Sequence, residues 1–229
     1  MITLTWLYTL AGAMFAAFAI LSALDTGTFL ELRREYAPAA ITALGRVDGH
    51  PLGVIANDPA HLAGAIDNEA AITFARHLRL CERWGIPVLS LCDTPGFMVG
   101  PDAEAEGLVR SAGELFRMAG SLTVPTGTIV TRRGFGLGAQ AMASGGFHEP
   151  RFTIAWPNSE FGPMGLEGAV KLGYRNELAA IDDPTDEVAL VAALAAIWAS
   201  ASPATAAPAA NEPAVPSTRA KARRSRKTG

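Results

Sequence analysis

The chain has 229 residues, about half of them hydrophobic, with a slightly positive mean hydropathy of +0.22. That length can bury a sizeable core, and that composition excludes a chain disordered over most of its length. Six of the 19 basic residues lie in the last thirteen residues, STRAKARRSRKTG. Residues 1–216 therefore contain 13 basic and 22 acidic side chains, a net charge of −9. This charge is not typical of a domain that binds nucleic acid specifically.

The chain opens with an uncharged stretch, residues 2–24, ITLTWLYTLAGAMFAAFAILSAL. Its length could span a bilayer. No positively charged region precedes it, and no clear cleavage site follows, so a secretory signal is not indicated. Three interpretations stay open: a membrane anchor, a helix buried against a partner, or an artefact of the start site.

The folded body is expected over residues 25–198 and opens with a hairpin. Residues 42–58 read as two short strands joined at Asp48-Gly49, a strong hairpin turn signal. A helix should follow within residues 63–87, because Ala70, Phe74 and Leu78 recur at helical spacing. Asp67 or Asn68 can cap its start, and a glycine and a proline stop its end.

Strands and helices then alternate along the rest of the body. We expect strands at 88–93, 123–130 and 152–157, and helices at 103–120, from about 138 and from about 166. This alternation predicts an α/β fold with buried parallel strands and right-handed crossovers. Ligands bind such sheets beyond the carboxyl ends of the strands, which here are the loops at 93–100, 134–138 and 157–165.

The end of the chain differs from the body. Residues 199–217, ASASPATAAPAANEPAVPS, are rich in Ala and Pro and read as a semi-rigid linker, and the basic tail after them as a solvated, disordered end. The two cysteines, Cys81 and Cys92, have neither ligand spacing nor a disulfide framework. They fit small core residues in a reducing compartment, which predicts a cytoplasmic protein unless residues 2–24 attach it to a membrane.

The sequence TRRGFGLGAQAMASG, residues 131–145, has glycines at alternate positions and few reactive side chains. Gly134, Gly136 and Ala139 match a dinucleotide-binding turn, but the acid expected about 20 residues on is replaced by Trp156 and Pro157. Alternatively, the turn opens a helix and presents free N–H groups as an oxyanion hole. A tight structural turn without a ligand is the third interpretation.

Other chemistries have weaker support in the sequence. Ser144 and Ser159 lack the context of a nucleophile elbow, and the four histidines have no metal-ligand spacing, so no metal is expected. Asp93 ends a predicted strand, where it could be catalytic. Capping of the following Thr94-Pro95-Gly96 turn is the interpretation that we prefer for it.

Several long motifs together resemble the carboxyltransferase (β) subunit of biotin-dependent acyl-CoA carboxylases, such as propionyl-CoA and methylcrotonyl-CoA carboxylases. They are VDGHPLGVIAND, AGAID, CDTPGFMVG, LTVPTGTIVTRRGFGLGAQAM and AWPNSEFGPMGLEGAV. The resemblance runs from about residue 24 to about residue 181. It implies a crotonase-like fold of repeated ββα units, and it matches only the second of the family's two domains.

The resemblance also implies the site. Backbone N–H groups of Leu137 and Gly138 would hold the ureido oxygen of biotin, or those of Gly138 and Ala139 if the match slips by one residue. Gln140 would lie where the family tunes substrate choice. The remaining lining residues would be Asp93, Pro95, Gly96, Phe97, Gly136, Met164 and Gly165.

The implied reaction moves a carboxyl group from carboxybiotin to the α-carbon of an acyl-CoA, with biotin carried on a partner. The family's first domain, which holds the acyl-CoA thioester, would come from another chain in a homo- or hetero-oligomer that also includes a biotin carboxylase and carrier subunit. Two alternatives remain: a truncated assembly or interaction fragment without chemistry, and an acyl-CoA decarboxylase subunit of the same fold.

Overall fold

The computed structural model describes residues 20, 23–179, 181, 185 and 188–194. The strands are β1 (Leu30–Leu32), β2 (Ala40–Val47), β3 (His50–Asn57), β4 (Val88–Thr94), β5 (Thr126–Phe135), β6 (Phe152–Ala155) and β7 (Glu160–Gly162). The helices are η1 (Leu62–Gly64), α2 (Asn68–Trp84), α3 (Pro101–Ala105), α4 (Leu108–Ala119), α5 (Gly136–Met142), α6 (Leu166–Gly173) and α7 (Arg175–Leu178).

The strands form one 7-stranded mixed sheet in the order β1-β2-β3-β4-β5-β6, and β7 pairs with the far end of β5. β2 pairs antiparallel with both β1 and β3, and β2 and β3 close at the pair Val47↔His50, which confirms the predicted hairpin. From β3 onward the pairs are parallel, as the alternation of strands and helices predicts. The carboxyl ends of β3, β4 and β5 therefore lie at one edge of the sheet.

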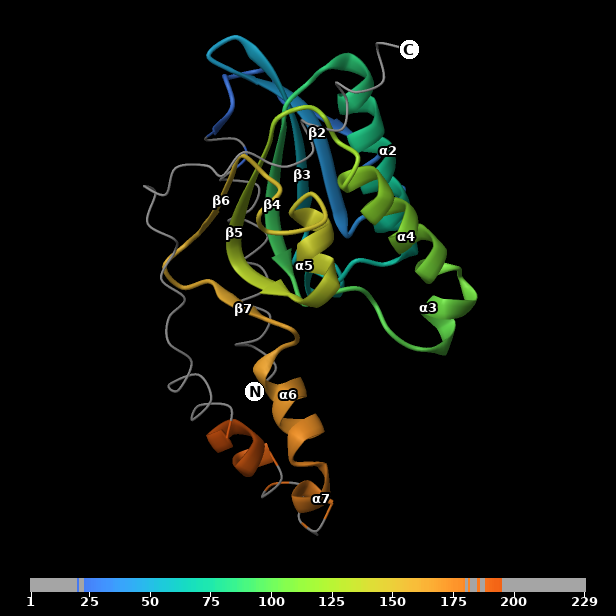
Figure 1. Cartoon of the computed structure of the whole chain (residues 1–229), viewed down its shortest axis with the longest axis vertical. Coiled ribbons are helices and arrows are strands. Elements are labelled where there is room, and N and C mark those ends of the chain that lie inside the picture. Colours follow the sequence, from blue (N-terminus) through green and yellow to red (C-terminus); the bar gives the residue numbers. More distant parts are fainter. Residues whose placement is uncertain (1–19, 21–22, 180, 182–184, 186–187, 195–229) are drawn as a thin grey trace, which may run out of the picture.

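Helices α2, α4 and α5 lie on one face of this sheet and close the main core (Figure 1). Phe74 and Leu78 of α2 pack there with Leu115 of α4 and Val130 of β5. The side chain of Asp67 caps α2 by accepting a hydrogen bond of 2.8 Å from the N–H of Ala70. The sequence thus placed this helix correctly, because its apolar spacing and its capping signals agree.

The opposite face of the sheet carries a second apolar cluster. Ile20 and Leu24 pack there on Val54 of β3 and Leu91 of β4, and Phe152 of β6 lies over the bare backbone of Gly127. Most of the uncharged stretch 2–24, the linker and the basic tail lie outside the described residues. Within the part of the chain that is described, no helix is long and apolar enough to cross a membrane.

Three elements differ from the sequence prediction. The helix expected over 103–120 is interrupted at Gly107, whose φ of 89° is incompatible with a helix and separates α3 from α4. β5 starts at Thr126 and continues through Phe135, so Gly134 belongs to the strand and the next helix begins at Gly136. The loop predicted at 157–165 contains β7, a strand that forms only because β5 extends far enough to pair with it.

Helices α6 and α7 extend away from the sheet, at the bottom of Figure 1. They form an arm with a small core of its own, in which Val170 and Leu178 are buried with Val191. The arm leaves the body directly after β7, at Pro163, Met164 and Gly165.

Candidate functional site

The first turn of α5 lies between two loops, and glycines allow the contact on both sides. A Cβ placed on Gly138 would lie 2.8 Å from both the Cα and the carbonyl carbon of Gly96. A Cβ on Gly136, whose φ is +59°, would lie 3.0 Å from the carbonyl oxygen of Pro163. The structure therefore brings together the three segments that the sequence predicted as loops at the carboxyl ends of the strands.

The loop that contacts Gly138 is held by hydrogen bonds on its other side. The carbonyl of Gly96 accepts a hydrogen bond of 3.0 Å from the N–H of Ile66, and the N–H of Met98 donates one of 2.9 Å to the carbonyl of Ile66. The Thr94 hydroxyl lies 3.1 Å from both the N–H and the carbonyl oxygen of Gly96. The ring of Phe97 packs on Phe116 of α4, with centroids 6.1 Å apart. This loop is a fixed wall beside α5, not a loose flap.

The start of α5 leaves backbone donors without helical partners. Its N-cap, Phe135, makes no side-chain capping hydrogen bond. The carbonyl of an N-cap residue accepts the first helical hydrogen bond, here from Ala139, so the N–H groups of Gly136, Leu137 and Gly138 have no acceptor within the helix. The side chain of Leu137 is 61% exposed, whereas Ala139 is fully buried and Gln140 is half-buried one turn further on.

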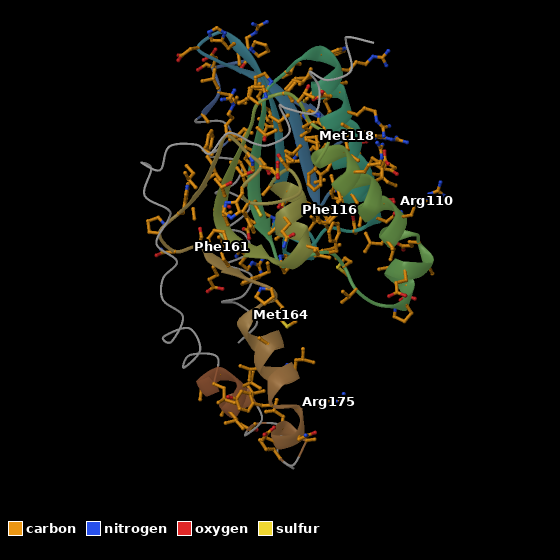
Figure 2. The ribbon with its side chains drawn as sticks, viewed as in Figure 1. Arg110, Phe116, Met118, Phe161, Met164 and Arg175 are labelled. Atoms are coloured by element: carbon orange, nitrogen blue, oxygen red, sulfur yellow. The ribbon has the colours of Figure 1, made fainter. Side chains whose placement is uncertain are left out.

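Residues after β7 supply the second wall. Phe161 and Met164 lie at the junction between the body and the arm (Figure 2). Both are partly exposed, at 43% and 38%. The Cβ position of Gly165 lies 3.8 Å from the ring of Phe135, the last residue of β5. Gly165 therefore adjoins the end of β5, directly before the first residue of α5.

Asp93 does not cap the Thr94-Pro95-Gly96 turn, contrary to the sequence interpretation. Asp93 as a whole is 4% exposed, and its carboxylate accepts hydrogen bonds from Arg132 Nε at 3.0 and 3.2 Å and from Arg133 Nε at 3.4 Å. Thr94 forms the turn bonds instead. Sequence reasoning missed both arginines, although two adjacent arginines at the end of a predicted strand were a usable signal.

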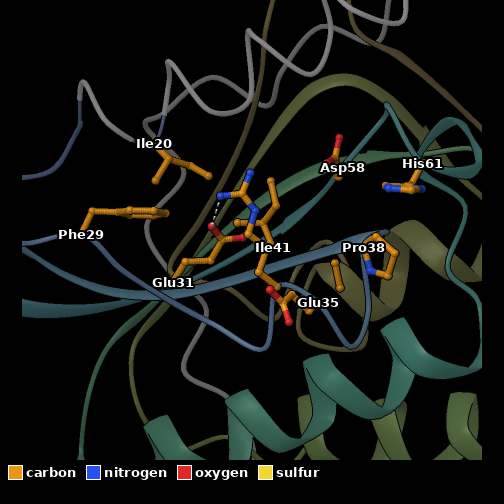
Figure 3. A pocket seen from close by; sticks show the side chains of 10 residues that line it. Ile20, Phe29, Glu31, Glu35, Pro38, Ile41, Asp58 and His61 are labelled. Carbon is orange, nitrogen blue, oxygen red and sulfur yellow. Dashed lines mark ion pairs between the residues drawn. The ribbon is translucent and has the colours of Figure 1, made fainter.

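A separate cavity of about 670 Å³ opens near β1 and β2 (Figure 3). None of the site residues predicted from the sequence lines it. Glu31, Glu35 and Asp58 give it three carboxylates against one arginine, Arg34, which pairs with Glu31 at 3.7 Å. Such a lining repels an anionic substrate, so this cavity does not suit acyl-CoA.

The buried titratable groups on the helix side of the sheet are held in their neutral forms. Burial lowers the pKa of His77 from 6.5 to about 4, and a hydrogen bond with the Ala43 backbone partly offsets this. Burial also raises the pKa of Cys81 to about 11 and that of Cys92 to about 12. Among the residues that the structure describes, no three His, Cys, Asp or Glu side chains gather in a way that could hold a metal ion.

Comparisons with known proteins agree with the fold and with the motifs. The family model described as the carboxyl transferase domain matches residues 18–215. The carboxyltransferase subunit of propionyl-CoA carboxylase from Haloferax mediterranei is 40% identical over 161 residues, 70% of this chain and 31% of that protein. The β5 subunit of a biotin-dependent acetyl-/propionyl-coenzyme A carboxylase from Mycobacterium tuberculosis is 38% identical over 151 residues, 66% of this chain and 27% of that one.

Solved structures give the same result. A single-chain, multi-domain long-chain acyl-CoA carboxylase matches with a TM-score of 0.72 and 52% identity over 79% of this chain and 18% of that one. The transcarboxylase 12S hexamer with bound methylmalonyl-coenzyme A matches at 0.69 with 32% identity, covering 80% and 34%. The crotonase-like fold expected from the sequence is confirmed. The chain spans about a third, or less, of the length of each of these relatives.

Proposed function

This chain belongs to the carboxyl transferase domain family of biotin-dependent acyl-CoA carboxylases, and we propose that it forms the biotin-side half of a carboxyltransferase site. In the proposed reaction a carboxyl group passes from carboxybiotin to the α-carbon of an acyl-CoA. The catalytic unit would be the domain at residues 25–198. The observation that carries the proposal is the first turn of α5, whose N–H groups have no acceptor within the helix and which lies between two loops.

The N–H groups of Leu137 and Gly138 are the proposed donors to the ureido oxygen of biotin. The alternative pair, Gly138 and Ala139, is less suitable, because the N–H of Ala139 is the first to enter the helical hydrogen bonds of α5. The choice of Leu137 and Gly138 therefore agrees with both the family motif and the local backbone.

The residues present fit a ureido group. A ureido oxygen carries no acidic proton and accepts from two donors, and two backbone N–H groups without an acceptor in the helix supply two donors without a competing acid or base. When bound, carboxybiotin supplies the carboxyl group and a ureido nitrogen that takes the α-proton of the substrate. The chain's own residues then position the group and stabilise the charge that develops on the ureido oxygen.

The walls of the site have separate proposed roles. Pro95, Gly96 and Phe97 fix one side of α5, and Met164 and Gly165 fix the other. Gln140, one turn beyond the donors and half-buried, is positioned to contact the acyl chain and to influence substrate choice. Asp93 acts through the arginines that it binds.

The other half of the site would come from a partner. We propose that a carboxyltransferase domain of another polypeptide binds the acyl-CoA thioester, and that a biotin carboxylase with its carrier subunit delivers the biotin.

The test is carboxyl transfer by the purified chain in the reverse direction, from a malonyl-type CoA to free biotin. It would be run with and without the amino-terminal carboxyltransferase domain of a propionyl-CoA carboxylase. Leu137→Pro removes one donor in the first helical turn, where proline is tolerated, and should lose transfer. Leu137→Ala keeps the N–H and should retain transfer.

Transfer that requires the partner and depends on the Leu137 N–H supports the proposal. Equal transfer by the Leu137→Pro and Leu137→Ala variants contradicts the assignment of the donor. Absence of transfer by folded wild-type protein with the partner present would favour a non-catalytic fragment.

A further inference from the structure

The pair of arginines held by Asp93 points to a binding site that the backbone donors of α5 do not explain. We propose that Arg132 binds an anionic group of the substrate, a carboxylate or a phosphate, and that Asp93 is the positioning residue that orients it. This inference rests on the proposed carboxyltransferase function, because it assigns the group to a ligand at the same edge of the sheet.

The local charge supports an anion. The Asp93 carboxylate is the partner of both guanidinium groups, so the cluster has one positive charge in excess. Its acid is 6% exposed in the side chain, whereas the side chains of Arg132 and Arg133 are 36% and 24% exposed. The negative charge is thus the buried member, and positive charge faces solvent. In residues 1–216, where 22 acidic side chains outnumber 13 basic ones, a local excess of positive charge is a specific feature that attracts anions.

The geometry singles out Arg132. Arg133 donates hydrogen bonds from Nε to Asp93 and from a terminal nitrogen to the carbonyl of Ala63, so its guanidinium already has two partners. Arg132 uses only Nε, in bonds of 3.0 and 3.2 Å to the two carboxylate oxygens. Among the described residues, its terminal nitrogens have no hydrogen-bond partner that would occupy them. A guanidinium held at Nε with free terminal N–H groups is ready for a bidentate bond to a planar or tetrahedral oxyanion.

The position links this arginine to α5. Arg132 lies on β5, the strand that runs into the helix, and Asp93 is the last residue but one of β4, the neighbouring strand. Asp93 is followed within three residues by Gly96, whose backbone contacts Gly138. One short segment therefore orients Arg132 at its start and supports the proposed biotin donors at its end. An anion on Arg132 would lie at the same edge of the sheet as the transferred carboxyl group.

Binding of small anions tests this without relying on catalysis. Calorimetric titrations at low salt would use malonate as the carboxylate probe and pyrophosphate as the phosphate probe. The variants would be Arg132→Gln, Arg132→Lys and, as a control with the same change in charge, Arg117→Gln on α4. Arg117 is exposed and forms an ion pair with Glu114 on the same helix, outside the cluster of Asp93, Arg132 and Arg133. Circular dichroism melting would confirm that each variant is folded.

We expect at least one probe to bind the wild type and the Arg117→Gln variant equally. Arg132→Gln should weaken that binding by about tenfold or more, as expected for a hydrogen bond between charged groups. Arg132→Lys should weaken it nearly as much, because lysine cannot reproduce a guanidinium held at Nε. Preference for malonate would identify the transferred carboxylate as the source, and preference for pyrophosphate the phosphates of the CoA.

Three results would overturn the inference: no binding of either probe to the wild type, equal binding by Arg132→Gln, or an equal loss in Arg117→Gln. The role of Asp93 has its own readout. Asp93→Asn should weaken probe binding when it is made in the wild-type protein. The same substitution made in the Arg132→Gln variant should leave probe binding unchanged. Binding that depends on Arg132, in a chain that shows no carboxyl transfer even with the partner domain present, would refute the proposed function and leave the anion site standing. Carboxyl transfer by the Arg132→Gln variant with unchanged KM and kcat would refute the anion site and leave the proposed function standing.

Discussion

Gly138 and Gly96 are in direct backbone contact: a Cβ on Gly138 would lie 2.8 Å from two backbone atoms of Gly96. Any larger residue at 138 must push away the loop that forms one wall of the site. The contact explains why a glycine is required here without any appeal to backbone dihedral angles, since the only demand is space. It also means that Gly138→Pro would remove an N–H and displace the wall together.

Gly138→Ala should therefore destabilise the fold by roughly 1–3 kcal/mol, as overpacking does, and should reduce carboxyl transfer by displacing the loop. Urea unfolding and the transfer assay measure the two effects. The matched control is Gly113→Ala on the exposed face of α4, where a Cβ meets nothing within 4 Å. There the helix should gain about 0.5–1 kcal/mol. A Gly138→Ala variant as stable and active as wild type would refute the close contact.

His77 makes stability depend on pH. Its pKa in the folded protein is about 4 because it is buried, below the ordinary value of 6.5. Between these values the unfolded chain binds more protons, so stability is complete above about pH 6.5 and falls as the pH drops toward 4. The full loss is on the order of 3 kcal/mol. Unfolding by urea at pH 7 and at pH 4.5 measures it.

His77→Gln should flatten this dependence, and His61→Gln, at an exposed position, should not. A wild-type protein whose stability is the same at both pH values would show that His77 is not held neutral by burial.

The two cysteines should be unreactive in the folded protein. Burial raises the pKa values of Cys81 and Cys92 to about 11 and about 12, so neither forms much thiolate at pH 8, and both are inaccessible. A thiol reagent should label neither residue until denaturant is added, and both afterwards. Ala105→Cys, at an exposed position, supplies the reactive control. Fast labelling of the native wild type would contradict the packing of the main core.

The cap of α2 should contribute measurable stability. Asp67→Ala removes the acceptor of the 2.8 Å bond from Ala70 and should cost about 1 kcal/mol of unfolding free energy. Asp67→Asn keeps an acceptor oxygen and should lose much less. The difference between the two variants in urea unfolding isolates the capping bond from the charge. Equal stability of the alanine and asparagine variants would show that the cap is not what fixes the start of α2.

The sequence predicted the hairpin and α2 well because their signals are local: the Asp48-Gly49 turn, the Asp67 cap and apolar residues at helical spacing. It also predicted which loops meet at the carboxyl ends of the parallel strands, since these loops follow from the alternation of strands and helices. The length of β5 and the presence of β7 could not be predicted. Each is stabilised by the other through pairing between segments about 27 residues apart, for example Arg133↔Glu160.

The role predicted for Asp93, capping of the following turn, was wrong for a related reason. A local turn signal follows it, and sequence reasoning assigned the carboxylate to that turn. In the structure the hydroxyl of Thr94 satisfies the turn, and Asp93 meets two arginines about 40 residues away. Sequence spacing says little about such a pairing, because it depends on β4 and β5 being neighbours in the sheet.

The arm formed by α6 and α7 has its own small core around Val170, apart from the two clusters on the sheet. Its amides should therefore exchange with solvent through local opening, at a lower free energy than the amides of β4 or β5. Met164 and Gly165 stand where this less stable unit joins the rigid sheet. This side of the proposed site would then move with the arm relative to the sheet. A polypeptide that binds the arm would also reduce that motion.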